Sequence, residues 1–182
     1  MKVFAKSFPS HSQWLKKPVN SGVYRYWLMD GGSLTRRLQS GCADFEVCPL
    51  KLHHAKPQAD EAALLVLAPQ QKALLREVHL NCGGKPVVFA HSVLPHAALR
   101  GDWQGLSRLG NRPLGGALYA DPCVVRTPLQ YKKLSSHHAL YHRAIAHLQS
   151  PPKVLWARRS VFTLRRAAIL VTEVFLPQIL VI

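Results

Sequence analysis

Two charged residues stand where the sequence otherwise predicts rows of buried apolar side chains. Alternate residues of a β-strand share one face, so Arg76 falls on the apolar face of a strand predicted over residues 74–80. Glu173 falls in the same way on the apolar face of a strand predicted over residues 168–176. A buried charge without a partner is too costly to keep. The two charges therefore either pair inside the protein or line a pocket and meet a ligand.

These two interpretations predict different chemistry. If Arg76 and Glu173 pair with each other or with neighbours, they form a structural salt bridge. If they line a pocket, a guanidinium fixed on a strand can hold a carboxylate through two charge-assisted hydrogen bonds. A carboxylate in the same pocket can accept or donate a proton. The residues alone leave both interpretations open.

The elements that would position these charges predict a single α+β domain. Two β-hairpins are expected. The first pairs residues 74–80 with 86–94 and turns at Gly83 and Gly84, and the second pairs residues 154–162 with 168–176. The other expected elements are a strand over 44–52, helices over 33–38, 60–69 and 137–149, and two short helices within 99–120. Strands joined by hairpins, with helices in separate blocks, indicate an antiparallel sheet covered by helices.

Length and composition fit one globular domain. The chain has 182 residues, of which 48% are hydrophobic, which is enough for a core. No apolar stretch approaches the roughly 20 residues that a membrane-spanning helix needs, and no secretory signal is visible, so a cytoplasmic location is expected. We expect a loosely held basic N-terminal arm over residues 1–20, with a short helix near Trp14. The folded domain is expected over residues 21–182, as a monomer.

The cysteines and histidines do not predict a metal site. No pair among the four cysteines, Cys42, Cys48, Cys82 and Cys123, has CxxC spacing, so free thiols in a reducing compartment are expected. His138 and His142 are four residues apart on an expected helix and could bind zinc, but no third ligand is evident. A solvated helix face explains the two histidines better. We therefore expect neither a metal nor a cofactor.

The formal net charge of +15 is large for a chain of this length. One explanation is nucleic-acid binding, in which Lys and Arg neutralise phosphates. Another is a positive field that attracts a small anionic substrate. The basic residues are scattered, mostly in pairs, and no aromatic stacking motif accompanies them. The charge alone does not decide between these partners.

Five segments resemble the chorismate pyruvate-lyase family, and they occur in the order of that family. They are residues 32–38 (GSLTRRL), 75–78 (LREV), 108–115 (RLGNRPLG), 155–160 (LWARRS) and 172–177 (TEVFLP). Two of the segments contain Arg76 and Glu173, the two misplaced charges. The resemblance runs from about residue 27 to the C-terminus. The arm before residue 20 lies outside it.

The resemblance implies both a reaction and a fold. The reaction splits chorismate into 4-hydroxybenzoate and pyruvate at the entry to ubiquinone synthesis, and product inhibition is expected. The fold is an antiparallel sheet with helical flaps that cover an internal ligand pocket. The substrate is a dicarboxylate, which suits a basic protein with an inward arginine. Aromatisation drives the reaction, so no cofactor is required.

The resemblance also implies roles for particular residues. Arg76 would hold the ring carboxylate, assisted by the backbone amides of Leu34 and Leu114. At position 34 the resemblance implies methionine at least as readily as the leucine of this chain, and a backbone contact is unaffected by that difference. Glu173 would lie near the ring hydroxyl. It would either assist proton removal or fix the hydroxyl, and the proton could instead pass to the leaving group within the substrate.

A second carboxylate needs a second cation. Alternation turns one of Arg158 and Arg159 inward, and Arg158 is our candidate for substrate binding. The competing interpretation of this pair is one surface charge and one charge in an ion pair.

A different class of function remains open. The same fold serves as the effector domain of some transcription regulators, so a non-catalytic sensor of small aromatic carboxylates is the main alternative. Such regulators carry a helix-turn-helix DNA-binding segment, and the 26 residues before the resemblance are too few for one. We therefore expect the enzyme.

Overall fold

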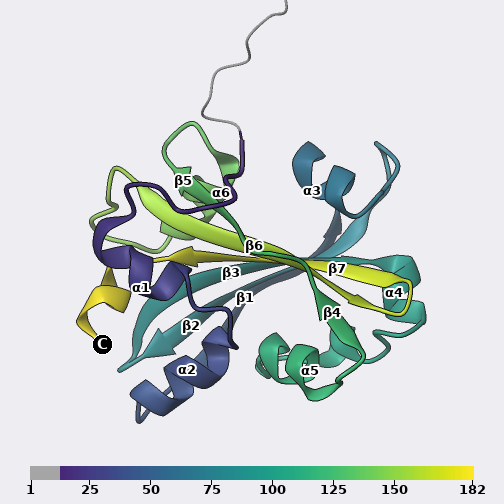
Figure 1. Ribbon diagram of the computed structural model, residues 1–182, viewed down its shortest axis with the longest axis horizontal. Helices are drawn as coiled ribbons and strands as arrows, with labels where there is room; N and C mark the ends of the chain where they lie inside the picture. Colours follow the sequence, from purple (N-terminus) through teal and green to yellow (C-terminus); the bar gives the residue numbers. More distant parts are fainter. Residues whose placement is uncertain (1–12) are drawn as a thin grey trace, which may run out of the picture.

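The computed structural model describes residues 13–182 as one antiparallel β-sheet with helices on both faces (Figure 1). The strands follow the order β1-β2-β3-β7-β6-β4, and β5 also pairs with β6. Their bounds are β1 (Glu46–Ala55), β2 (Ala73–Cys82), β3 (Lys85–Pro95), β4 (Val124–Arg126), β5 (Gln130–Leu134), β6 (Leu155–Leu164) and β7 (Ala167–Phe175). This arrangement confirms the predicted α+β class and the antiparallel sheet.

The helices are short and lie in separate groups. Their bounds are α1 (Arg25–Leu28), α2 (Leu34–Gly41), α3 (Ala59–Leu64), α4 (His96–Arg100), α5 (Leu114–Ala120) and α6 (Ala139–Ile145), with 3-10 turns at Gly22–Tyr24, Leu106–Arg108 and Pro177–Val181. Figure 1 shows α1, α2 and α5 on one side of the sheet and α3 and α6 on the other. Ser33 accepts a hydrogen bond from the Arg36 amide and caps α2, as its residue type predicts.

The two predicted hairpins form the centre of the sheet. β2 pairs with β3, β6 pairs with β7, and β3 and β7 join the two hairpins. The register places Arg76 opposite Ser92, and Glu173 between Ala90 and Arg158. The two charges singled out from the sequence therefore lie on central strands of one rigid sheet.

The strands β4 and β5 were not predicted from the sequence. Both are short, and Pro122 and Pro128 flank β4, so no clear alternation marks them. They pair with β6 and extend the sheet beyond the predicted hairpins.

Both faces of the central strands are buried. Eight consecutive residues of β2, Ala73 to Leu80, are shielded from solvent. Leu34, Val78 and Leu80 belong to a cluster on the face beneath α2, whereas Leu75 and Val93 belong to a cluster on the opposite face. The polar side chains Glu77 and His79, which alternation turns away from Arg76, therefore also lie in the interior.

The expectation of free thiols is wrong for two of the four cysteines. Cys42 and Cys82 form a disulfide, with their Cα atoms 5.7 Å apart. The sequence separation of 40 hides this contact, but α2 ends beside the end of β2 and brings the two cysteines together. The bond ties the C-terminal end of α2 to the sheet. Cys48 and Cys123 are free thiols, as expected.

Part of the expected arm packs on the sheet. Residues 1–12 lie outside the described residues. Leu15 forms an antiparallel bridge with Tyr131, and the indole of Trp14 donates a 2.9 Å hydrogen bond to Asp60. The helix expected near Trp14 is absent, because this segment is extended along β5. The last residues of the arm are thus held in place.

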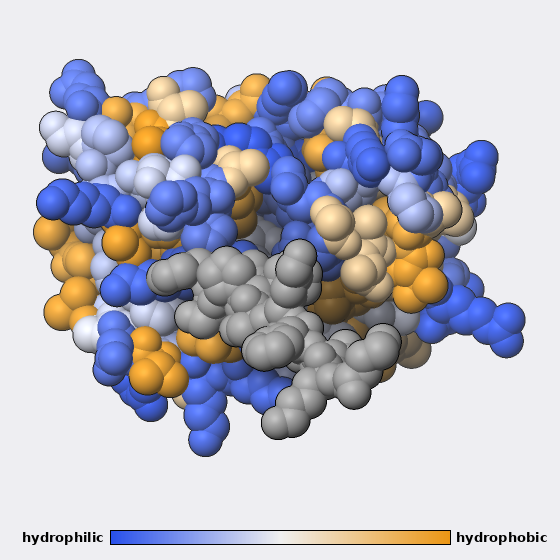
Figure 2. All heavy atoms as spheres, turned by 90° about the horizontal axis from the view of Figure 1, so that it is seen from above, coloured by the Kyte–Doolittle hydropathy of each residue, from blue (hydrophilic) through white to orange (hydrophobic). Residues whose placement is uncertain are grey.

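Among residues 13–182, no helix has the length and apolar character needed to cross a bilayer. Figure 2 shows one face of the molecule, on which hydrophilic residues are spread widely and apolar residues occur in small groups.

A buried ionic cluster fastens α3 to the face of the sheet opposite α2. The imidazole of His91 on β3 is fully buried, and its two nitrogens lie 3.2 Å from Glu77 on β2 and 3.2 Å from Glu61 on α3. Arg143 on α6 contacts the same Glu77 oxygen at 2.7 Å. Burial lowers the pKa of His91, but the two carboxylates outweigh burial and raise it overall.

This cluster predicts a pH-dependent stability. A histidine whose pKa is raised by folding stabilises the protein fully below its unfolded value of about 6.5, and that contribution is lost as the pH rises through the folded value. The free energy of unfolding should therefore fall above pH 6.5. Urea denaturation of His91→Gln should show a smaller fall than the parent, whereas the exposed control His137→Gln should behave like the parent. An equal fall in all three proteins would contradict this role.

Candidate active site

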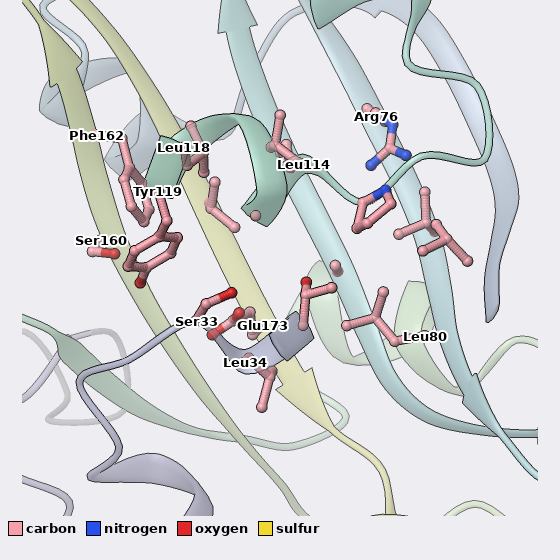
Figure 3. Close-up of a pocket in the computed structure, with 18 of the residues that line it drawn as sticks. Ser33, Leu34, Arg76, Leu80, Leu114, Leu118, Tyr119, Ser160, Phe162 and Glu173 are labelled. Atoms are coloured by element: carbon pink, nitrogen blue, oxygen red, sulfur yellow. The ribbon is translucent and has the colours of Figure 1, made fainter. Parts of the chain in front are cut away.

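A cavity of about 570 Å³, measured out to its mouth, lies between the sheet and the helices α2 and α5 (Figure 3). The sheet supplies its floor through β2, β3, β6 and β7. The segments that begin α2 and α5 cover it, and we call these two segments, residues 30–41 and 110–120, the flaps. Apolar side chains form most of its wall, among them Val78, Leu80, Leu114, Leu118 and Phe162.

Arg76 projects from β2 into one end of this cavity (Figure 3). Its Nη2 donates hydrogen bonds of 3.0 Å to the carbonyl oxygens of Gly110 and Arg112, which precede α5. The side chain is 6% exposed, and burial lowers the pKa of its guanidinium. Among residues 13–182, no aspartate or glutamate forms an ion pair with it. The structural salt bridge considered from the sequence is thus not formed by Arg76.

Glu173 lines the cavity from β7 and does have a partner. Its Oε2 accepts a 2.5 Å hydrogen bond from Nε of Arg158, the neighbouring residue on β6. Arg158 is fully buried, and its Nη1 also donates to the carbonyl oxygens of Trp27 and Asp30. The pair therefore joins the sheet to the chain segment that enters the first flap.

The predicted amide donors occupy equivalent places on the two flaps. Leu34 is the first residue of α2 and Leu114 the first of α5, and both line the cavity. Backbone N–H groups in the first turn of a helix have no partner within the helix. These two amides can therefore donate to an anion bound near them.

The two flaps are held to each other by a third arginine. Nη1 of Arg126 on β4 donates to the hydroxyl of Tyr119 at 2.6 Å and to the carbonyl oxygen of Gly31 at 2.7 Å. Tyr119 in turn donates to the carbonyl oxygen of Gly32 at 3.1 Å. These bonds connect the second flap, which carries Tyr119, to the first.

The structure brings four of the five predicted site residues to one cavity. Arg76, Leu34, Leu114 and Glu173 all line it. Arg158 does not, because its guanidinium is taken up by Glu173 on the adjacent strand and by the carbonyl oxygens of Trp27 and Asp30. Only one arginine of the 158–159 pair faces this side, as strand alternation predicts, because Arg159 lies on the other face and contacts Asp60 at 2.6 Å.

Three polar residues of the cavity were missed from the sequence. Tyr119 lies on a helix that was predicted, but nothing in its surroundings marks it as polar lining. Ser160 ends the segment 155–160 of the family resemblance, but no role was expected for it. Arg126 follows two valines in the unrecognised strand β4, and that short β-branched run was the one available signal.

Among residues 13–182, no group of three or more His, Cys, Asp or Glu side chains is placed to hold a metal ion. The two histidines of the zinc alternative make local contacts instead, His138 with Ser135 and His142 with Ser136.

Comparison with known proteins places this chain in a family. The family model described as "Chorismate lyase" matches residues 9–181, nearly the whole chain. The chain belongs to the chorismate lyase family. The match includes part of the N-terminal arm, which lay outside the resemblance seen in the five segments.

Curated relatives in the family are similar over almost their full length. A protein of Methylobacillus flagellatus named "Probable chorismate pyruvate-lyase" is 54% identical over 168 residues, which cover 92% of this chain and 94% of that protein. A protein of Nitrosomonas eutropha with the same name is 52% identical over 167 residues, which cover 91% of this chain and 94% of that protein.

Solved structures with this fold include transcription regulators. PhnF of Mycobacterium smegmatis superposes with a TM-score of 0.59 at 14% identity, over 82% of this chain and 66% of that chain. A GntR-family regulator of Bacillus cereus superposes with a TM-score of 0.54 at 11% identity, over 74% of this chain and 92% of that chain. At such identities, the likeness concerns the fold alone.

The second flap packs tightly against the first at Gly115. A methyl group at Gly115 of α5 would lie 2.9 Å from Thr35 Oγ1 and 3.3 Å from Ser33 Oγ. The variant Gly115→Ala must therefore push the flaps apart, and we expect it to weaken the binding of 4-hydroxybenzoate about 10-fold, or roughly 1.4 kcal/mol. Isothermal titration calorimetry measures this change.

Gly116→Ala provides a matched control on the same helix. A methyl group at this exposed position meets no atom within 4 Å. Its affinity for 4-hydroxybenzoate should equal that of the parent. Equal weakening in both variants would mean that helix α5 itself, rather than the contact between flaps, is sensitive to alanine.

Proposed function

We propose that this protein is a chorismate pyruvate-lyase that converts chorismate into 4-hydroxybenzoate and pyruvate without a cofactor. The observation that carries the proposal is Arg76, a guanidinium almost fully buried in a flap-covered cavity with no acidic partner among the described residues. A buried charge of this kind calls for a ligand carboxylate. Membership of the chorismate lyase family supplies the identity of the carboxylate ligand.

The reaction needs no oxidant, reductant or co-reactant. The bond between the ring and the enolpyruvyl oxygen breaks, and its electron pair leaves with that oxygen. The neighbouring ring carbon, which bears the hydroxyl, loses its proton, and the electron pair of that C–H bond completes the aromatic ring. The released enolpyruvate takes up a proton on its methylene carbon and becomes pyruvate. The protein has only to orient the substrate, stabilise the departing oxygen and exclude water.

Each cavity residue has a place in this scheme. Arg76 holds the ring carboxylate, with the amides of Leu34 and Leu114 as further donors. Glu173, on β7 beyond the ring, either fixes the hydroxyl or accepts the ring proton. Arg158 is a positioning residue that fixes the Glu173 carboxylate and does not touch the substrate. Full turnover by Glu173→Gln would exclude Glu173 as the base.

The flaps suggest that product release limits the rate. The Arg126 and Tyr119 bonds hold the two flaps together over the cavity, so the product can leave only after they open. Product inhibition follows, because 4-hydroxybenzoate keeps the carboxylate that Arg76 binds. A burst of product in the first turnover is the kinetic sign of this order of events.

The proposal extends to the setting of the enzyme. We propose a monomeric cytoplasmic protein that supplies 4-hydroxybenzoate to ubiquinone synthesis, with a folded unit over residues 21–182 and a basic arm before it. Nucleic acid has no part in the proposal, and the net positive charge serves to attract a dianionic substrate.

Incubation of the purified protein with chorismate alone tests the function. Chromatography for 4-hydroxybenzoate and an enzymatic assay for pyruvate should show both products in equal amounts. Saturable binding of hydroxybenzoate without turnover would replace the lyase with a sensor. The absence of turnover and binding, together with tight salt-sensitive binding of nucleic acid, would replace it with a nucleic-acid-binding protein.

A further inference from the structure

A second guanidinium, that of Arg126, reaches the cavity from β4. Its Nε donates a 2.8 Å hydrogen bond to the hydroxyl of Ser160, and its Nη1 donates to Tyr119 and to the carbonyl oxygen of Gly31. The carbon of the guanidinium also lies 5.1 Å from the centre of the Phe162 ring. These contacts fix the cation in one orientation. Its remaining nitrogen, Nη2, makes no hydrogen bond within residues 13–182.

The charges that line the cavity do not cancel. Glu173 is its only acidic lining residue among the described part of the chain, and Arg158 already neutralises it. Arg76 and Arg126 are the two basic lining residues, and neither forms an ion pair with an acid in residues 13–182. The cavity therefore offers two uncompensated positive charges. This number matches a dianion better than it matches a monocarboxylate.

The two cations lie on opposite sides of Glu173. In the order of the sheet, Arg76 is on β2, Glu173 on β7 and Arg126 on β4, beyond β6. Figure 3 shows Arg76 at one side of the cavity, Tyr119 and Ser160 at the other, and Glu173 between them. Because Arg126 is bonded to both Tyr119 and Ser160, it belongs to the side away from Arg76.

We propose that Arg126 binds the carboxylate of the enolpyruvyl group of chorismate and retains it on the pyruvate product. The inference rests on the proposed function, which places the ring carboxylate at Arg76 and the ring hydroxyl near Glu173. The ring carbon that bears the ether is next to the carbon that bears the hydroxyl. The enolpyruvyl group must then lie at the end of the cavity near Glu173, where Arg126 supplies the free cation.

The other arginines near this end are already occupied. Arg158 bonds Glu173 and the carbonyl oxygens of Trp27 and Asp30, and it does not line the cavity. Arg159 lies on the other face of the sheet with Asp60 and Gln130. The sequence-based candidate for the second carboxylate was Arg158, which lies on β6, next to β4. In this proposal Arg126 on β4 takes that role instead.

A pair of stable ligands isolates this subsite from catalysis. The probe meta-(1-carboxyvinyloxy)benzoate carries both carboxylates on a ring that is already aromatic, so it cannot undergo the elimination. Its partner meta-isopropoxybenzoate has a similar shape and only the ring carboxylate. Calorimetry on the parent should show that the dicarboxylate binds about 10- to 100-fold more tightly, the range expected for one charge-assisted contact.

The variant Arg126→Gln should abolish this advantage. Loss of the Arg126 bonds between the flaps should weaken meta-isopropoxybenzoate and 4-hydroxybenzoate to a similar extent, whereas the dicarboxylate should lose a further roughly 10- to 100-fold. Arg166→Gln, which removes one exposed charge in the turn between β6 and β7, should keep the full advantage. Arg126→Lys, which keeps a cation, should keep part of it and serves as the test if Arg126→Gln does not fold.

The outcomes separate this inference from the proposed function. An equal affinity of the parent for both ligands, or an unchanged advantage in Arg126→Gln, would overturn the subsite. An equal loss of affinity for both ligands in Arg126→Gln would reduce Arg126 to a link between the flaps. Failure of the parent to convert chorismate concerns the proposed function and is measured separately.

Discussion

Arg76→Ala is expected to lower kcat/KM for chorismate about 30- to 4,000-fold, which corresponds to the roughly 2–5 kcal/mol lost when one partner of a buried charged contact is removed. The physical reason is that Arg76 is buried without an acidic partner, so its charge is available for the ring carboxylate. Steady-state kinetics and calorimetry with 4-hydroxybenzoate measure the two effects. Both should show a loss, because substrate and product share this carboxylate.

Replacing the Arg76 charge by an apolar side chain of similar size should not destabilise the empty protein much. A buried cation without an ion pair stabilises the fold little, and its two hydrogen bonds to flap carbonyls offset only part of its desolvation. Thermal unfolding of Arg76→Met without ligand should begin at the temperature of the parent or above it. Retained turnover in Arg76→Ala would contradict the role of Arg76, and Arg166→Ala controls for the loss of one charge.

Arg158→Met is expected to lower the free energy of unfolding by about 3–5 kcal/mol, the usual effect of removing one partner of a buried ion pair. Arg158 is fully buried and bonds Glu173 and the carbonyl oxygens of Trp27 and Asp30. Its loss leaves a half-buried carboxylate and two carbonyl oxygens without their donor. Urea denaturation followed by tryptophan fluorescence measures the change.

The double variant Arg158→Met/Glu173→Met distinguishes the ion pair from packing. Replacement of both charges by apolar side chains of similar size is often neutral, so the double variant should recover much of the lost stability. Its turnover should stay below that of the parent, because the Glu173 carboxylate lines the cavity. A double variant less stable than Arg158→Met would contradict the ion pair as the source of the effect.

The sequence predicted the parts of the fold that depend on local patterns. Alternation along 74–80 and 168–176, with Gly83 and Gly84 between the first pair of strands, indicated the two hairpins that form the centre of the sheet. The same alternation exposed Arg76 and Glu173 as polar exceptions on apolar faces. These two exceptions do lie in one cavity. Local pattern was sufficient here because strand periodicity fixes the face of each side chain.

The parts that were missed depend on contacts between distant segments. The disulfide joins Cys42 to Cys82 because α2 ends beside β2, and no local signal reports this. Arg126 belongs to a three-residue strand too short for alternation to appear. The choice between Arg126 and Arg158 depends on which of them Glu173 neutralises. To know which arginine Glu173 neutralises, one needs the register of β6 against β7, and local sequence patterns do not predict it.

A crystal structure of the protein with 4-hydroxybenzoate tests the central claim most directly. We expect the ring of 4-hydroxybenzoate to lie in the cavity beneath α2 and α5. Its carboxylate should contact Arg76 and the amides of Leu34 and Leu114, and its hydroxyl should lie beside Glu173. A ligand bound elsewhere, or bound with its carboxylate away from Arg76, would contradict the account.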